Sequence, residues 1–199
     1  MSDRGRQDVA TMAVFVSGTG RTLENFCERI ADGTLRARIG VVVASKECPA
    51  LDKARARGIP AEVHPGTLTE AALRKVLERA GADWVVLAGY TKLMAIPEGY
   101  EGRVVNIHPA LLPKFGGKGM YGMRVHEAVI AAGEKRSGCT VHLCDGKYDT
   151  GPIVAQASCE VRADDTAQTL AARVFELEKE LYPRALNALL AGARESSRA

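Results

Sequence analysis

The strongest constraint on the fold is a regular alternation of short strand-like segments with amphipathic stretches. The strand-like segments are residues 12–16, 39–43, 61–63, 84–87 and 104–106. Between them, a helical pattern follows the turn at residues 17–22 through about residue 31, and further helical patterns cover residues 51–57 and 67–80. Because strands that alternate with helices pair in parallel through right-handed crossovers, we expect a Rossmann-like α/β fold with helices on both faces of a mostly parallel, twisted sheet.

The C-terminal part of the chain has a different pattern. Residues 139–144 alternate between polar and apolar side chains, residues 145–152 are rich in turn formers, and residues 153–161 form another strand-like run. This order predicts an antiparallel hairpin at the sheet edge. A long amphipathic helix is expected over residues 166–191, with Thr166 as its N-cap and with Pro183 kinking it or ending its first segment.

Composition excludes several classes of function. The chain has 199 residues, which suits one domain, and a net charge of +3 without a basic block, which argues against nucleic acid as the main partner. We find no apolar run long enough for a membrane span and no signal-peptide core at the N-terminus, so we expect a cytoplasmic protein that does not bind membranes. Five cysteines without a CxxC and four histidines without zinc-ligand spacing predict no metal site.

The run 103–113 carries an unusual pair of polar side chains. Asn106 and His108 are two residues apart, so an extended backbone directs both to one face. Pro109 favours an extended His108, and Pro113 prevents a regular continuation. An amide and an imidazole at the end of a parallel strand lie where open α/β sheets bind ligands. The alternatives are a turn asparagine and an ordinary packed histidine.

A glycine-containing turn follows the first expected strand. Residues 17–22 read Ser-Gly-Thr-Gly-Arg-Thr and lead into a helix, an arrangement that presents backbone N–H groups to a phosphate. The third glycine of a dinucleotide motif is replaced by Leu23, and the Walker lysine is absent. A mononucleotide phosphate or a phosphosugar therefore fits better than a dinucleotide. A plain strand–helix turn is the alternative.

Four further features have open interpretations. Residues 115–122 hold four glycines, which favours a loop that covers a ligand over a mere connector. His126, on the helix that follows, is expected on the helix surface or packed back against this loop. Asp149 alone favours a turn residue. Glu178 lies at the edge of the apolar stripe of the last helix, where it could face the sheet, although a solvated acid is the expected state.

Taken together, these motifs resemble those of the folate-dependent formyltransferases, in particular the phosphoribosylglycinamide formyltransferases, over about residues 12–190. The matching segments are 17–23, 86–90, 106–113, 140–142 with 149–152, and Glu178 ahead of 182–183. The chain departs from the family pattern in the loop 116–122 and around residues 64–69. In the second region we find no equivalent of the arginine that contacts folate in the family.

The resemblance implies one formyltransferase domain over residues 1–199, with a phosphate-binding half at 11–100 and a catalytic, folate-binding half at 101–192. It implies formyl transfer from 10-formyltetrahydrofolate, as co-substrate, to the amine of 5-phosphoribosylglycinamide. The implied catalytic residues are Asn106, His108 and Asp149. The implied phosphoribosylglycinamide-binding residues are Gly18, Thr19, Gly20, Arg21, Thr22, Arg173 and Glu178. The implied folate-binding residues are Leu87, Tyr90, Thr91, Lys92, Leu93, Met94, Asn106 and Asp145.

These roles suit acyl transfer from an amide to an amine. The tetrahedral intermediate needs hydrogen-bond donors, which Asn106 and His108 can supply, and a route for one proton. We expect Asp149 to raise the pKa of His108 and to orient its ring. The expected partners are small molecules, and the chain is expected to be a monomer or a homodimer. Alternatives are formyl transfer to an amino sugar, to methionyl-tRNA or to water, and a non-catalytic nucleotide-binding module.

Overall fold

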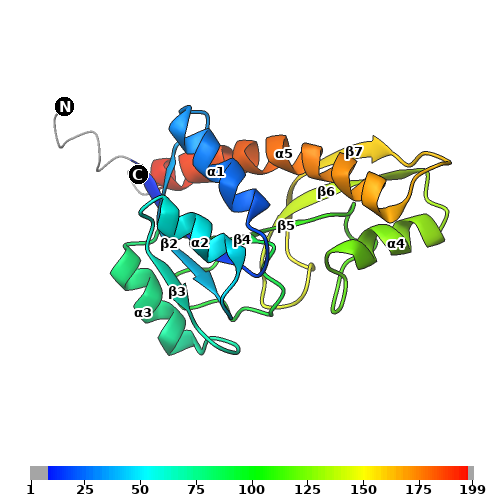
Figure 1. Cartoon of the computed structure of the whole chain (residues 1–199). Helices are drawn as coiled ribbons and strands as arrows, with labels where there is room; N and C mark the ends of the chain where they lie inside the picture. The colour runs from blue at the N-terminus through cyan, green and yellow to red at the C-terminus, as the bar shows by residue number, and fades with distance from the viewer. Residues whose placement is uncertain (1–8, 197–199) are drawn as a thin grey trace.

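The computed structural model describes residues 9–196 as a seven-stranded sheet flanked by helices (Figure 1). The elements are β1 (Ala10–Val16), α1 (Arg21–Ala31), β2 (Ala37–Ala44), α2 (Pro49–Ala56), β3 (Ala61–Val63), α3 (Glu70–Ala80), β4 (Trp84–Ala88), β5 (Val104–His108), α4 (Met123–Ala131), β6 (Arg136–Leu143), β7 (Ile153–Glu160) and α5 (Ala167–Ser196). The expected α/β fold is confirmed. The first and last residues of the predicted domain lie outside the described part.

The strand order is β3-β2-β1-β4-β5-β6-β7. Strands β1 to β5 pair in parallel, whereas β6 is antiparallel to both β5 and β7. The predicted hairpin at the sheet edge is therefore confirmed. Because the chain winds outward in opposite directions from β1 and β4, the carboxyl ends of these two strands border the crevice where open α/β sheets bind ligands.

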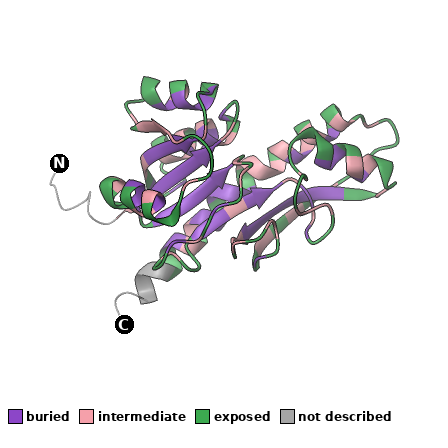
Figure 2. Cartoon of the chain, turned by 90° about the horizontal axis from the view of Figure 1, so that it is seen from below, coloured by how far each residue is buried: buried purple, intermediate pink, exposed green. Residues whose placement is uncertain are grey.

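Helices cover both faces of the sheet, as expected. One core layer joins side chains of α1, α2, α4 and α5 to the sheet, and the other packs α3 against the opposite face. Strand β1 is buried from Thr11 to Val16, because it lies in the middle of both layers. Figure 2 shows the same pattern, with buried strands inside and exposed outer faces on the helices. A rigid, buried sheet therefore carries the loops at the strand ends.

Some element boundaries differ from the predicted ones. Helix α3 begins at Glu70 instead of residue 67, because the Thr69 hydroxyl accepts a hydrogen bond from the Ala72 N–H and caps the first turn. Strand β6 begins three residues earlier than expected, at Arg136. The predicted N-cap of α5 is confirmed, since the Thr166 hydroxyl accepts from the Thr169 N–H at 3.2 Å.

Helix α5 does not end at Pro183. A proline cannot donate to the carbonyl four residues before it, which here belongs to Lys179. The side-chain amide of Asn25, from α1, donates to that carbonyl at 3.0 Å. A neighbouring helix thus satisfies the group that proline leaves without a partner, and α5 continues through this position.

Tyr182, the residue before the proline, connects α5 to the sheet by hydrogen bonds. Tyr182 is fully buried, and its hydroxyl lies 3.0 Å from the Leu87 carbonyl and 3.1 Å from the Val105 carbonyl. These two acceptors belong to β4 and β5. The tyrosine therefore holds the helix against the two strands that lead into the candidate site.

Candidate active site

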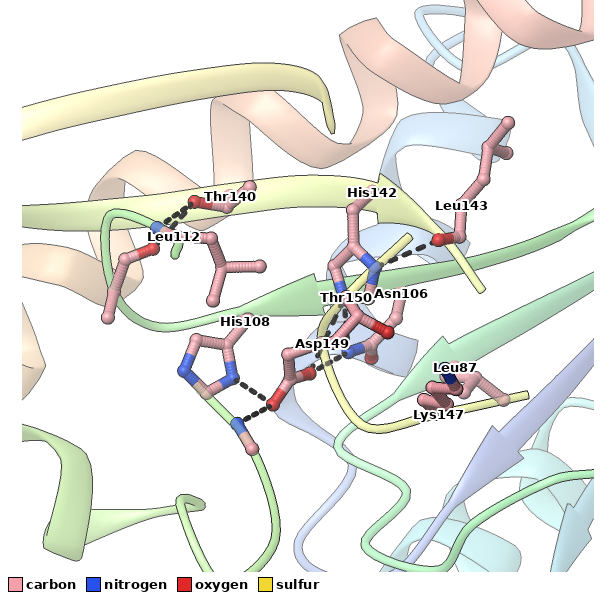
Figure 3. A network of polar contacts seen from close by, with 12 residues as sticks. Leu87, Asn106, His108, Leu112, Thr140, His142, Leu143, Lys147, Asp149 and Thr150 are labelled. Atoms are coloured by element: carbon pink, nitrogen blue, oxygen red, sulfur yellow. Dashed lines mark hydrogen bonds and ion pairs between the residues drawn. The ribbon is translucent and has the colours of Figure 1, made fainter. Parts of the chain in front are cut away.

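Three polar side chains converge beyond the carboxyl end of β5. Asn106 and His108 project from that strand, and Asp149 reaches them from the loop between β6 and β7 (Figure 3). Asp149 Oδ1 lies 3.5 Å from Asn106 Nδ2, and Asp149 Oδ2 lies 3.5 Å from His108 Nδ1. The convergence expected from the sequence is observed. Asp149 lies in a bend of the loop between β6 and β7, and its carboxylate faces the imidazole.

The glycine loop after β5 holds the Asp149 carboxylate. The Gly117 N–H donates to Oδ2 at 2.9 Å, and Asp149 itself has a left-handed backbone with φ of 57°. A Cβ on Gly116 would lie 2.6 Å from the Leu112 side chain and 3.1 Å from Asp149 Cβ, so a larger residue would displace the Leu112 side chain and crowd Asp149. Burial alone would raise the pKa of Asp149, but hydrogen bonding and the nearby imidazoles of His142 and His108 hold that pKa below its usual value.

His108 is buried, with 3% of its surface exposed. Its Nε2 lies 2.7 Å from the carbonyl oxygen of Phe115, which must act as the acceptor. Burial lowers the pKa of His108, whereas Asp149 and the Phe115 carbonyl act to raise it, and burial prevails. The expected effect of Asp149 is therefore present but outweighed, and the pKa of His108 is below the usual value for histidine.

A second imidazole, that of His142, also lies at the site, although no sequence pattern predicts it there. Antiparallel pairing sets His142 opposite Asn106, and its Nε2 lies 3.1 Å from Asn106 Nδ2 and 3.5 Å from Asp149 Oδ1. Its Nδ1 lies 3.0 Å from the Leu143 carbonyl, so Nδ1 donates and Nε2 accepts from the amide. This bond sets the orientation of the Asn106 side chain. The alternation of polar residues on β6 is the signal for His142, but it does not reveal the strand opposite.

Between β1 and α1, Gly18 and Thr19 are exposed, and Gly20 is buried as the N-cap residue with φ of 77°. A Cβ on Gly20 would lie 2.8 Å from the Ala50 Cα, whereas a Cβ on Gly18 would meet nothing within 4 Å. Arg21 begins α1 and stacks its guanidinium 3.6 Å from the Phe175 ring centre, and Thr22 follows half-buried. Gly20 is thus required for packing, while Gly18 faces open space.

The two predicted binding residues on α5 have different surroundings. Burial raises the pKa of Glu178 to about 7, against the opposing charge of Arg21. The Glu178 side chain is half-buried, so it is only partly the solvated acid that its position favoured. The Arg173 guanidinium pairs with both carboxylate oxygens of Asp165, at 2.7 and 2.8 Å. Among the residues described, no hydrogen bond links Arg173 to the loop 17–22.

The residues predicted to bind folate lie mostly at the end of β4. Leu87 is paired with Asn106 in the sheet, and the Thr91 N–H donates to the Ser17 hydroxyl at 3.2 Å, which joins this segment to the glycine turn. Tyr90 packs edge-on against Phe15 with 5.5 Å between ring centres. Of the remaining predicted residues in this segment, Lys92 is half-buried, Leu93 exposed and Met94 buried.

Asp145 lies in the β6–β7 loop. Its carboxylate accepts from the Lys147 N–H and from the Thr150 hydroxyl, so it stabilises the turn that leads to Asp149. Within residues 9–196 we find no cluster of three or more acidic, histidine or cysteine side chains that could hold a metal ion. No helix in the same range has the length and apolar character needed to cross a membrane.

Comparison with known proteins identifies the family. The family model described as Formyl transferase matches residues 10–186. A chloroplastic phosphoribosylglycinamide formyltransferase of Arabidopsis thaliana is 41% identical over 188 residues, and the one of Vigna unguiculata is 44% identical over 187. Each match covers 89% of this chain but only 64% and 60% of the respective relative, so the chain spans less than two thirds of these curated proteins.

A solved structure agrees with this match. The glycinamide ribonucleotide transformylase 1 of Symbiobacterium toebii superposes with a TM-score of 0.84 at 31% identity, covering 93% of this chain and 89% of that one. The family match over residues 10–186 includes Asn106, His108 and Asp149. On these grounds the chain belongs to the formyl transferase family.

Proposed function

We propose that this protein transfers the formyl group of 10-formyltetrahydrofolate to the amine of 5-phosphoribosylglycinamide, a step of purine biosynthesis. The observation that carries the proposal is the convergence of Asn106, His108 and Asp149 beyond β5, beside the crevice bordered by the ends of β1 and β4. The names of the relatives support the same reaction. We also propose that residues 11–100 hold the phosphate and residues 101–192 carry the chemistry, with the folate bound where the two halves meet.

The attacking amine must be neutral. Glu178, with a pKa of about 7, is matched to take a proton from the substrate ammonium near neutral pH. Burial supplies this basicity, because a solvated carboxylate would be too weak a base. Arg21, whose charge acts on Glu178, begins α1 directly after the glycine turn. The phosphate of the substrate would bind the backbone N–H groups of that turn, which comprises Gly18 to Thr22.

The tetrahedral oxyanion needs hydrogen-bond donors. One Asn106 amide hydrogen is held by His142 at 3.1 Å, while the other faces Asp149 at 3.5 Å, the outer limit of a hydrogen bond. The second hydrogen is free to turn toward a substrate oxygen. Because His108 Nε2 donates to the Phe115 carbonyl, the group that would donate to the oxyanion is the Nδ1–H of the protonated ring, which faces Asp149 at 3.5 Å, the outer limit of a hydrogen bond, and the Asp149 carboxylate stabilises that imidazolium. The amine proton then passes to the departing folate nitrogen. The reaction does not require a covalent bond between the formyl group and the enzyme.

The folate would bind against the segment at the end of β4. There Leu87 pairs with Asn106 in the sheet, and the Thr91 N–H donates to the Ser17 hydroxyl beside the glycine turn. A folate site here brings the formyl group to the polar end of β5. Lys92 is the cation in this segment available to a folate carboxylate. Two predicted binding residues would contribute only indirectly. Asp145 would act on folate binding by stabilising the loop of Asp149, and Arg173, which is paired with Asp165, would act on phosphoribosylglycinamide binding from a distance.

The test is a spectrophotometric assay for loss of 10-formyltetrahydrofolate, run with 5-phosphoribosylglycinamide, with glucosamine, with methionyl-tRNA and without any acceptor. We expect turnover only with the phosphoribosyl amine. His108→Ala should lower kcat by about 10²–10³-fold, the usual effect of removing one oxyanion donor, with little change in KM. Equal turnover without an acceptor would indicate hydrolysis, and substrate binding with no turnover would indicate a non-catalytic module.

A further inference from the structure

Helix α1 lies beside helix α5 (Figure 1), and side chains join the two helices. The Asn25 amide donates to the Lys179 carbonyl at 3.0 Å. One helical turn earlier on both helices, the guanidinium carbon of Arg21 lies 3.6 Å from the centre of the Phe175 ring. This is close to the van der Waals contact distance, so the cation rests on the face of the ring. The stacked pair stands at the end of α1 that follows the glycine turn.

Phe175 does not belong to the hydrophobic core. Neither of the two core layers built from the described residues 9–196 includes this side chain, although it is large and aromatic. The residue is half-buried, and within the same range its ring stacks with Arg21 alone. The ring therefore contributes more to the placement of Arg21 than to the packing of the sheet.

The Arg21 guanidinium has no acidic partner. Every other arginine within α1, α2 and α3 pairs with a carboxylate. In the described part of the chain, no hydrogen bond or ion pair involves the Arg21 side chain. Burial raises the pKa of Glu178 and the Arg21 charge opposes this effect, so the two residues are neighbours, yet they form no ion pair. Arg21 is exposed, and its N–H donors are therefore available to a ligand.

A cation with this placement suits a phosphomonoester. Arg21 is the first residue of α1, so its side chain extends from the same turn as the N–H groups that the helix start leaves without partners. The planar guanidinium matches two phosphate oxygens. Stacking on a ring also restricts a long side chain before the ligand arrives, so less conformational entropy is lost on binding.

We propose that Phe175 is a positioning residue, whose ring holds the Arg21 guanidinium where it binds the phosphate of the substrate. This inference rests on the proposed function for the identity of the substrate, but binding of the phosphate group can be measured without turnover. It requires that Phe175 act only through Arg21. The ring should improve phosphate affinity about two- to fivefold, the effect of an exposed cation–π contact.

The test compares the wild type with Arg21→Met, Phe175→Leu and the double variant. Calorimetry measures the affinity for ribose 5-phosphate, with ribose as the unphosphorylated reference, and kinetics measures KM for 5-phosphoribosylglycinamide. Arg21→Met should weaken both by about tenfold or more, the effect of a lost hydrogen bond between charged groups. Phe175→Leu should weaken both by about two- to fivefold with kcat unchanged.

Two results separate positioning from a general structural role. The double variant should bind ribose 5-phosphate as weakly as Arg21→Met and no more weakly, because the ring has no cation left to hold. Phe175→Tyr keeps the ring and should keep the wild-type affinity and KM. Arg184→Met is the matched control, since it removes the same charge from an exposed position further along α5, and its affinity should equal that of the wild type.

The inference is overturned if the wild type does not bind ribose 5-phosphate at millimolar concentration, or if Phe175→Leu keeps the wild-type affinity and KM. Independent effects of the two substitutions in the double variant would also overturn it. Ribose 5-phosphate binding with the expected pattern but without formyl transfer would support this inference and contradict the proposed function. Formyl transfer with a KM that neither substitution changes would contradict this inference alone.

Discussion

The carbonyl oxygen of Phe115 lies 2.7 Å from His108 Nε2, while Asp149 faces the other nitrogen of the same ring at 3.5 Å. Both ring nitrogens therefore meet acceptors, which favours the protonated imidazole, but burial favours the neutral one and lowers the pKa. Phe115 and Asp149 each have a φ of 57°, a conformation that costs a residue other than glycine about 1–3 kcal/mol. The His108 ring is thus held between two residues with strained backbones, and opposing effects of burial and hydrogen bonding act on its pKa.

The Asp149 charge and the Asp149 backbone can be separated by mutation. Asp149→Asn keeps an acceptor for the Gly117 N–H and tolerates the left-handed backbone, so it should change Tm little. Without the carboxylate, the pKa of His108 should fall further, and kcat should fall by about 10²-fold or more. Asp149→Ala should lower both kcat and Tm. NMR titration of His108 and steady-state kinetics provide the measurements, and an Asn variant with full turnover would contradict the role of the charge.

The two glycines of the turn should respond differently to substitution. Gly18→Val has room and an ordinary backbone, so we expect an unchanged Tm and a KM for the phosphorylated substrate raised at least tenfold. Gly20→Ala would place a Cβ 2.8 Å from the Ala50 Cα on a positive-φ backbone, so its main effect should be a lower Tm. Thermal unfolding and substrate saturation curves distinguish them. A wild-type KM in the Gly18→Val variant would show that the substrate phosphate does not bind at this turn.

Glu178 should make stability depend on pH in a characteristic way. Its pKa rises from 4.5 to about 7 on folding, so its protonated form stabilises the protein below pH 4.5, and that contribution is lost as pH rises through 7. Glu178→Gln should therefore match the wild type at pH 4 and exceed its free energy of unfolding at pH 8, by up to about 3 kcal/mol. Denaturant titrations at both pH values measure this, and kcat at pH 8 should fall in the same variant. If the difference in free energy of unfolding between wild type and Glu178→Gln did not depend on pH, the raised pKa of Glu178 would be contradicted.

His126 should make stability depend on pH in the direction opposite to Glu178. His126 is buried in α4, so of the two expected placements the helix surface is wrong, and burial together with nearby His108 lowers its pKa from 6.5 to about 4. The neutral ring contributes stability above pH 6.5, and this contribution is lost as pH falls through 4. His126→Leu should remove up to about 3 kcal/mol of acid-induced destabilisation between these pH values. Identical acid unfolding of wild type and His126→Leu would contradict this prediction.

The alternation of strands and helices, the common face of Asn106 and His108, and the glycine turn before Arg21 could all be predicted from the sequence. Each depends on a period or a turn residue within a few positions, and the structure contains all of them. The continuity of α5 could not be predicted in this way, because the group that compensates Pro183 is the Asn25 amide of a distant helix.

The polar groups at the strand ends can be listed from the amino-acid sequence alone. Which of them face one another, and in which protonation state, depends on how folding brings distant segments together. The antiparallel register of β5 and β6 brings His142 to Asn106, and the Gly117 N–H holds Asp149 beside His108. Burial sets the pKa of Glu178 and of His126. Register and burial depend on segments far apart in the chain, so no local pattern encodes them.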